Sequence, residues 1–283
     1  MSKLTGINTD MSGRVGKYVF RQTPLGTIVS QAPRKPKIPR RSEQQKNRRT
    51  LLGNLAAFYR LFEGSLRRGF EGTPAGQHAF NAFVKANINQ SGVYITKSEK
   101  TQGGAVVAPY LITCGSIASI AAELQSGTLV SDIKLAGLTI DERTKVRDFA
   151  SAVVAANRAF RFGDALTFFL LKQSLDRVTG VPRVEFLRCQ VKLELGVTTP
   201  LWEVVDKSGF FSVNNYLGMG MPLEDAGAAW VHSRHADDST PRVSTQSLIV
   251  NNRVLDNYTG DEARIRAIES YGGINNEAVY FEP

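Results

Sequence analysis

The stretch DALTFFLLKQSLDRVTGVPRVEFLRCQVKLEL, residues 164–195, indicates most clearly which kind of fold this chain adopts. Its two arms, residues 164–175 and 183–195, are rich in aromatic, leucine and β-branched side chains, which favour strands. Between the arms, residues 176–182 contain Asp, Gly and Pro, which favour a turn. We therefore predict two strands here that pair with each other.

Similar signals lie on both sides of this pair. We predict further strands over residues 93–96, 105–113, 128–136, 228–233, 243–250 and 279–281. A helix is expected over residues 141–157, with Asp141 as its N-cap and Val146, Phe149 and Val153 on one face. A late helix is expected from Thr259, with Glu262 completing a capping box, to about Tyr271. Strands with one long inserted helix favour an antiparallel sandwich over an alternating parallel fold.

The N-terminal part of the sequence predicts a hairpin, an extended arm and helices instead of a series of strands. Residues 14–31 predict a β-hairpin, and residues 32–41 contain three prolines, which favour an extended arm. A helix is expected from Ser42, because Leu51, Leu55, Phe58, Phe62, Leu66 and Phe70 recur at steps of three and four. Gly69 and Gly72 are its expected stop, and a second helix should cover residues 75–88.

These elements predict an α+β protein with three parts. Residues 1–41 should form the hairpin and the basic, proline-rich arm, and residues 42–90 a helical hairpin. Residues 91–283 should form a mainly antiparallel, β-sandwich-like domain with inserted helices.

Charge is concentrated at one end of the chain. Residues 1–70 hold 15 of the 35 Lys and Arg residues but three of the 26 acidic residues, a net charge of +12, whereas the remainder carries −3. The candidate binding residues lie in the arm and the start of the helix: Arg34, Lys35, Lys37, Arg40, Arg41, Lys46, Arg48 and Arg49. They could bind nucleic-acid phosphates, dock on a neighbouring subunit, or form a solvated surface; charge patterning alone does not separate these three interpretations.

Composition excludes several other classes. Met1 is followed by a polar stretch instead of a secretory signal, and no apolar run is long enough to cross a bilayer. Cys114 and Cys189 are the two cysteines, so neither a disulfide framework nor a thiolate zinc site is expected. We therefore expect a protein of a reducing compartment, such as the cytoplasm.

Signals for catalysis are weak. His232, His235, Asp237 and Asp238 could together ligate a divalent ion, which would suit a metal-dependent hydrolase. Strand alternation favours another interpretation, in which His232 shares a face with Trp230 and residues 234–239 form a polar turn. Neither cysteine has a local nucleophile signature, and GSIAS at residues 115–119 lacks the second glycine of a hydrolase elbow. We predict no catalytic residues, no metal and no cofactor.

Several short segments resemble a protein family. They are SGRVGKYVFR at residues 12–21, GTIV at 26–29, RSEQQ at 41–45, FNAFVKAN at 80–87, FGDALTF at 162–168, WVHSR at 230–234 and VSTQ at 243–246. Together with Pro33, they resemble an uncharacterised family found in Bacteroidetes and their phages, domain of unknown function 6266. The resemblance implies a helical pair plus a β-sandwich-like part, and no reaction.

From these observations we expect a non-enzymatic structural protein that packs against copies of itself or neighbouring subunits through its N-terminal arm. A bacteriophage virion component, associated with capsid, neck or tail, fits the basic arm and the lack of site chemistry. The alternative is a sequence-independent nucleic-acid-binding protein that uses the same arm. No membrane or small-molecule partner is expected.

Overall fold

The computed structural model describes residues 2–3, 12–23, 26–32, 42–62, 64–73, 77–235 and 241–271. The chain divides into two compact units, Met1–Ser42 (unit 1) and Glu43–Pro283 (unit 2). The predicted α+β class is confirmed, because helices combine with antiparallel sheets in one chain. None of the helices among the described residues combines the length and the apolar character that crossing a bilayer requires.

Unit 1 is a small antiparallel sheet with strand order β1-β4-β3-β2. Its strands are β1 Ser2–Lys3, β2 Gly13–Val15, β3 Tyr18–Thr23 and β4 Gly26–Gln31. Gly16, with φ of +56°, and Lys17 join β2 to β3 as a tight two-residue loop, a conformation that glycine adopts without strain. The predicted hairpin therefore lies within a larger sheet, whereas most of the predicted arm, residues 33–41, lies outside the described residues.

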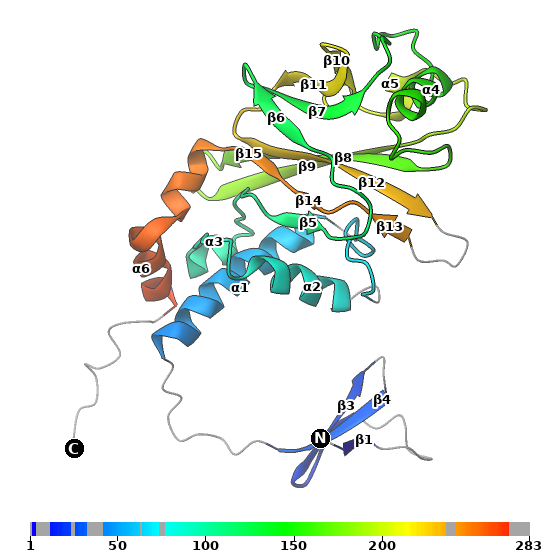
Figure 1. Cartoon of the computed structure of the whole chain (residues 1–283). Coiled ribbons are helices and arrows are strands. Elements are labelled where there is room, and N and C mark those ends of the chain that lie inside the picture. The colour runs from blue at the N-terminus through cyan, green and yellow to red at the C-terminus, as the bar shows by residue number, and fades with distance from the viewer. Residues whose placement is uncertain are drawn as a thin grey trace, which may run out of the picture. The chain divides into compact units, whose positions relative to one another are not determined.

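A central sheet organises unit 2 (Figure 1). Its strands are β8 Ala165–Leu175, β9 Pro182–Lys192, β12 Ala226–His235, β13 Pro241–Val243 and β15 Ile249–Asn251. β8 pairs with β9 along its whole length, from Ala165 opposite Lys192 to Leu175 opposite Pro182, so the predicted strand pair is confirmed. β12 pairs with β8 on one side and with both β13 and β15 on the other.

A second sheet packs on one face of the central sheet. It has the order β10-β11-β7-β6 and consists of β6 Ala122–Gln125, β7 Thr128–Lys134, β10 Phe211–Val213 and β11 Tyr216–Pro222. Phe168 of β8 and Trp230 of β12 face it in one hydrophobic cluster, together with Phe149 of α4 Val146–Ala156. The short helix α5 Leu201–Val204 adds Leu201 to the same cluster. These two sheets form the sandwich-like part of the fold.

Helices cover the other face of the central sheet (Figure 1). Phe169 of β8 and Val231 of β12 share a cluster with Phe58 of α1 Glu43–Leu61 and Phe83 of α2 Gln77–Asn87. The helical pair therefore completes the same core as the strands. Smaller elements complete unit 2: α3 Lys97–Thr101, β5 Leu111–Thr113, β14 Gln246–Ser247, the 3-10 helix η1 Arg253–Tyr258 and α6 Gly260–Ser270.

The prediction that one helix extends from residue 42 to residue 70 is wrong. α1 ends at Leu61, and Phe62 and residues 64–69 lie in turns and bends, in which Gly64 adopts φ of +86°. Leu66 and Phe70 are buried, as the apolar stripe predicts, but they enter the core from these turns. A stripe of buried residues reports which side faces the core, and it does not require a continuous helix.

One predicted strand is absent and another is shorter than predicted. Residues 93–96 form no ladder, although Val93 and Ile95 are buried, and only residues 111–113 of the strand predicted over 105–113 pair, as β5. Side chains take the place of a partner strand before β5, because Val107 N–H donates to Gln173 Oε1 and Asn252 Nδ2 donates to the Val107 carbonyl. Buried backbone needs hydrogen-bond partners, and amide side chains can supply them.

Two predicted caps differ as well. Asp141 caps a turn by accepting from the N–H groups of Arg143 and Thr144, and α4 begins only at Val146. Thr259 precedes α6 but makes no capping hydrogen bond through its side chain. The strand predicted at residues 279–281 lies outside the described residues.

Candidate functional site

The eight predicted binding residues are divided by the described range. Arg34, Lys35, Lys37, Arg40 and Arg41 lie outside it, whereas Lys46, Arg48 and Arg49 lie in the first turns of α1. Arg48 is exposed and makes no ion pair with a described residue. The Arg49 guanidinium lies 5.7 Å from the ring centroid of Tyr271, which follows α6. Arg49 therefore already has an intramolecular partner.

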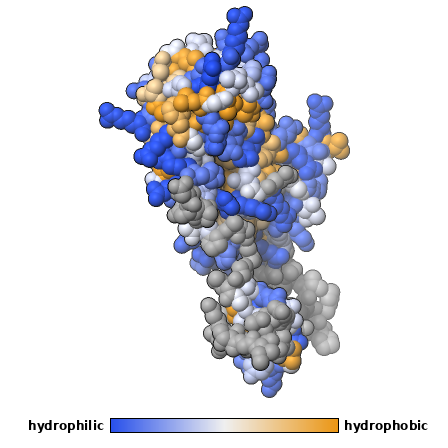
Figure 2. All heavy atoms as spheres, turned by 90° about the vertical axis from the view of Figure 1, so that its right-hand side faces the viewer, coloured by the Kyte–Doolittle hydropathy of each residue, from blue (hydrophilic) through white to orange (hydrophobic). Residues whose placement is uncertain are grey.

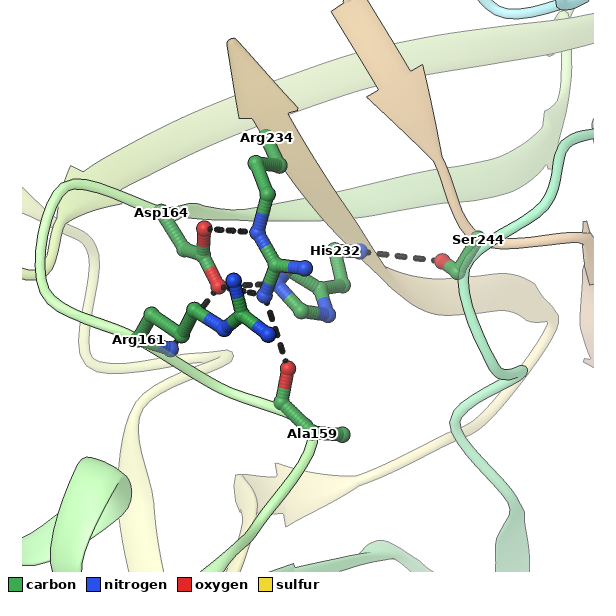
Figure 3. Close-up of polar contacts among 6 residues, drawn as sticks. All are labelled: Ala159, Arg161, Asp164, His232, Arg234 and Ser244. Atoms are coloured by element: carbon green, nitrogen blue, oxygen red, sulfur yellow. Dashed lines mark hydrogen bonds and ion pairs between the residues drawn. The ribbon is translucent and has the colours of Figure 1, made fainter. Parts of the chain in front are cut away.

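The densest polar cluster of the described residues surrounds Asp164 (Figure 3). One carboxylate oxygen, Oδ1, lies 2.7 Å from Nε of Arg234. The other oxygen, Oδ2, lies 2.7 Å from both Nη2 of Arg234 and Nε2 of His232, and it also accepts from the Arg161 N–H at 2.9 Å. The side chains of Asp164 and His232 are 2% and 1% exposed, so the hydrogen bond between them is shielded from water.

The fold fixes the positions of these three side chains. Ser233 pairs with Ala165 across β12 and β8, and this register brings Arg234 and His232 next to Asp164 at the start of β8. The His232 main chain exchanges two hydrogen bonds with Ser244, and the Phe160 ring stacks on the imidazole at a centroid distance of 4.2 Å. Rigid neighbours therefore hold the imidazole in one orientation.

Electrostatics assign the charges in this cluster. Burial raises the pKa of Asp164, but the hydrogen bonds from Arg234, His232 and the Arg161 N–H outweigh burial, and the pKa ends below its usual value. Burial lowers the pKa of His232, and the Asp164 carboxylate offsets this only in part. Near neutral pH, the cluster therefore contains an ionised Asp164, a charged Arg234 and a neutral imidazole that donates from Nε2.

The predicted alternation of β12 is confirmed at His232. Its side chain is buried on the Trp230 face, whereas His235, three residues later, is exposed and lies on the opposite face with Val231 and Ser233. The two histidines therefore do not converge on one ion. Asp237 and Asp238 lie outside the described residues, and among those described no three His, Cys, Asp or Glu side chains are grouped as a metal site needs.

Asp164 and His232 correspond to two of the three members of a nucleophilic triad, and the nucleophile is missing among the described residues. In the described part of the chain, no hydroxyl or thiol hydrogen-bonds to the His232 imidazole, and the Ser244 hydroxyl contacts only the main-chain N–H of His232. Cys189 lies elsewhere on β9, and burial raises its pKa to about 11, which keeps it a neutral thiol. The geometry supports a structural role for Asp164, His232 and Arg234.

Sequence reasoning missed Asp164 because it lies 68 residues before His232, and only the pairing of β8 with β12 brings them together. One signal was available: alternation places His232 on the buried face, and a buried histidine needs a hydrogen-bond partner. That signal predicts a partner without identifying it.

Comparisons with known proteins add no assignment. A scan against protein-family models, a search of curated proteins and a search of solved structures found no match to this chain. The resemblance to the Bacteroidetes and phage family stays a prediction, and a functional proposal depends on the residues and their geometry.

Proposed function

We propose that this protein is a non-enzymatic assembly component, of the kind found in bacteriophage virions, that docks on copies of itself through its N-terminal unit. The observation that carries the proposal is the exposed sheet of unit 1. Val15 and Tyr18 on this sheet are 57% and 58% exposed, and Thr27 is the single buried side chain among those described in unit 1. The sheet thus keeps hydrophobic side chains available for a partner.

A sheet of this size gains little stability by itself. Small sheets need a hydrophobic face packed on another layer before they are stable in water. Val19, Phe20, Ile28 and Val29 are only half-buried in unit 1. Docking would bury such side chains and supply the missing stabilisation, at roughly 25 cal/mol per Å² of apolar area. The outer strand β2 could also pair with a neighbouring strand.

Unit 2 of a second copy is the surface on which unit 1 can dock. Unit 1 contains nine basic residues and one acidic residue, whereas unit 2 contains 26 basic and 25 acidic residues and is close to neutral, so charge does not oppose the contact. Unit 2 also offers hydrophobic surface, since Figure 2 shows hydrophobic residues gathered on the upper part of the face it presents. Phe162, Leu195 and Val204 are among its exposed side chains. A contact between two different surfaces can repeat from copy to copy, as an assembly requires.

Sedimentation velocity tests this proposal. We expect the full chain to form species larger than a monomer, and we expect deletion of residues 1–41 to leave a folded monomer. The double variant Val15→Ser/Tyr18→Ser should also be monomeric, because it removes the exposed hydrophobic side chains of unit 1 and keeps its charges.

The matched control is Leu175→Ser/Val178→Ser, which removes two hydrophobic side chains that are 47% and 92% exposed on unit 2. This control should assemble like the full chain. A monomeric wild-type chain at its highest soluble concentration, or a truncated chain that assembles normally, would contradict docking through unit 1.

Sequence-independent nucleic-acid binding is the second candidate. It is favoured by Lys46 and Arg48, which the structure places at the start of α1 directly after the basic segment. Phosphates would be the contacted groups, because the arm has few aromatic side chains to stack on bases. The metal-dependent hydrolase has less support, since His232 and His235 lie on opposite faces of β12.

A further inference from the structure

An open groove lies in unit 2 between the turns that follow α1 and the central sheet, with a volume of about 610 Å³. Arg67 and Arg68 belong to the wall made by the turns. Thr167 and Phe169 of β8 lie in the sheet, and Arg188 of the outer strand β9 lies beyond them. The described residues that line the groove all belong to unit 2, so this proposal rests on other residues than the docking proposed above.

Among the described residues, the groove is lined by positive charge and by no carboxylate. Arg67, Arg68 and Arg188 are exposed, and none of them forms an ion pair with a described residue. No Asp or Glu is among the described residues that line the groove. Glu71 lies beside the lining residue Val243, and its Oε1 is occupied by the Val243 N–H at 2.6 Å and the Ser116 hydroxyl at 3.3 Å. An anion in the groove would therefore meet three guanidinium groups.

Uncharged donors are also available in the groove. Thr167 is 5% exposed, yet its hydroxyl makes no hydrogen bond within the described part of the chain. The Ser233 hydroxyl, on the same face of the sheet, likewise has no described partner. The Gln190 side chain accepts from Nη2 of Arg188 at 2.9 Å through its oxygen, which leaves its amide hydrogens as donors. The Thr167 hydroxyl is not among the fully buried polar atoms that lack a partner, so it is accessible from the groove and can donate to a bound oxygen.

We propose that this groove binds the phosphate group of a ligand, either a free nucleotide or pyrophosphate, or the phosphodiester backbone of a nucleic acid strand. A phosphate presents oxygens in several directions, which matches donors on opposing walls, and guanidinium groups bind it through paired hydrogen bonds. The volume lies within the range of pockets for small molecules, and the open side would let a strand pass. Phe169, 2% exposed, is too deeply buried to stack on a base.

The three histidines provide a localised readout. His235 lines the groove, His78 lies in α2, and His232 is buried against Asp164 on the other face of β12. We would titrate the full chain with inorganic pyrophosphate and follow the imidazole proton resonances by NMR, with His235→Gln assigning one of them. The His235 resonance should shift, and those of His78 and His232 should stay in place.

The variant Arg67→Ser/Arg68→Ser/Arg188→Ser should weaken pyrophosphate binding on the order of a thousandfold, because each of the three lost charge-assisted hydrogen bonds weakens binding by about tenfold. Its matched control, Arg143→Ser/Arg158→Ser/Arg177→Ser, removes the same charge from exposed sites outside the groove and should bind like wild type. Thr167→Val keeps the shape and charge of the groove where β8 lines it and removes one hydroxyl donor. It should weaken pyrophosphate binding by a few-fold to about tenfold.

A second titration, with an oligothymidylate of about 12 nucleotides, identifies the source of the phosphate. A strand-binding groove should show the His235 shift at lower oligothymidylate than pyrophosphate concentration, and a small-molecule site should show the reverse. The proposal is overturned if neither ligand moves the His235 resonance at low salt. It is also overturned if the groove and control triple variants lose binding equally, since net charge alone would then explain the affinity.

Discussion

Asp164 illustrates what one buried charge requires of its neighbours. Its carboxylate is 2% exposed and is satisfied by Arg234, His232 and the Arg161 N–H. Arg234 balances the charge from a position that is still 26% exposed, and it also donates to the Ala159 carbonyl. Removing one partner of such a pair leaves a buried charge unmatched. This typically lowers the free energy of unfolding more than replacing the whole pair with hydrophobic residues does.

The neutral His232 makes stability depend on pH. The pKa of His232 in the folded state lies below the ordinary histidine value of 6.5, because the side chain is buried, so around that pH the unfolded chain binds a proton that the folded chain resists. The free energy of unfolding should therefore fall as the pH drops from about 7.5 to about 5.5, at up to about 1.4 kcal/mol per pH unit for this one site. Asp164, whose pKa is also lowered, adds a further loss at more acidic pH.

Urea unfolding at a series of pH values measures this dependence. His232→Gln keeps a donor near Asp164 and removes the titration, so its stability should change less over the same range. His235→Gln is the control, because His235 is exposed and lies outside the cluster. A His232→Gln variant with the same pH slope as wild type would show that other groups set the dependence.

At the scale of elements, the central sheet explains which strands could be predicted. β8 packs on both faces, with Phe168 toward the second sheet and Phe169 toward the helices. Strands buried on both faces show near-continuous apolar runs, and LTFFLL at residues 166–171 is such a run. The polar turn at residues 176–181 then separates it from β9, so the strongest local signal coincided with the centre of the fold.

Other elements depend on contacts that no local pattern contains. Residues 105–110 are apolar enough for a strand, but Gln173 and Asn252 satisfy the main chain at Val107. α1 ends at Leu61, before the last apolar positions of the stripe, because Leu66 and Phe70 reach the core from the turns that follow the helix. The groove could not be predicted either, because Arg67 and Arg188 are 121 positions apart in the sequence and meet only through packing. Spacing along the chain predicts burial better than it predicts partners.

The contact between the two sheets depends on a glycine. Gly209 accepts a hydrogen bond from Trp230 Nε1 at 2.8 Å, and a Cβ at this position would lie 2.0 Å from Cδ1 of Phe168. Gly209→Ala should therefore force the two sheets apart and lower the free energy of unfolding by about 1–3 kcal/mol or more. Urea denaturation measures the change.

Gly196→Ala is the matched control, since nothing lies within 4 Å of a Cβ there and the change should stay within about 0.5 kcal/mol. Equal stabilities of the two variants would mean that the packing around Phe168 is looser than the structure shows.

At the scale of the whole molecule, basic residues occupy two surfaces with different expected roles. The basic segment at residues 34–41 belongs to unit 1, the proposed docking region, and Arg67, Arg68 and Arg188 line the groove of unit 2. Both surfaces could attract a polyanion, because electrostatic attraction does not distinguish between partners. The salt dependence of binding shows which surface holds the polyanion. Each neutralised phosphate releases counterions, so removing the residues that contact phosphates reduces the slope of log affinity against log salt concentration.

If the arm binds nucleic acid, with about six phosphates neutralised, affinity for a DNA duplex should fall on the order of a thousandfold between about 50 and 200 mM salt. Changing Arg34, Lys35, Lys37, Arg40 and Arg41 together to Ser should then remove most of the binding and flatten that slope. The triple variant of the groove should keep nearly all of the duplex binding, because phosphate contacts made by the residues of the arm do not involve the groove. Fluorescence anisotropy over a salt series gives the slope of log affinity against log salt concentration for the wild type and for each variant. A slope that the five-site variant leaves unchanged, or no binding at low salt, would remove nucleic acid from the partners of the arm and leave subunit docking as its role.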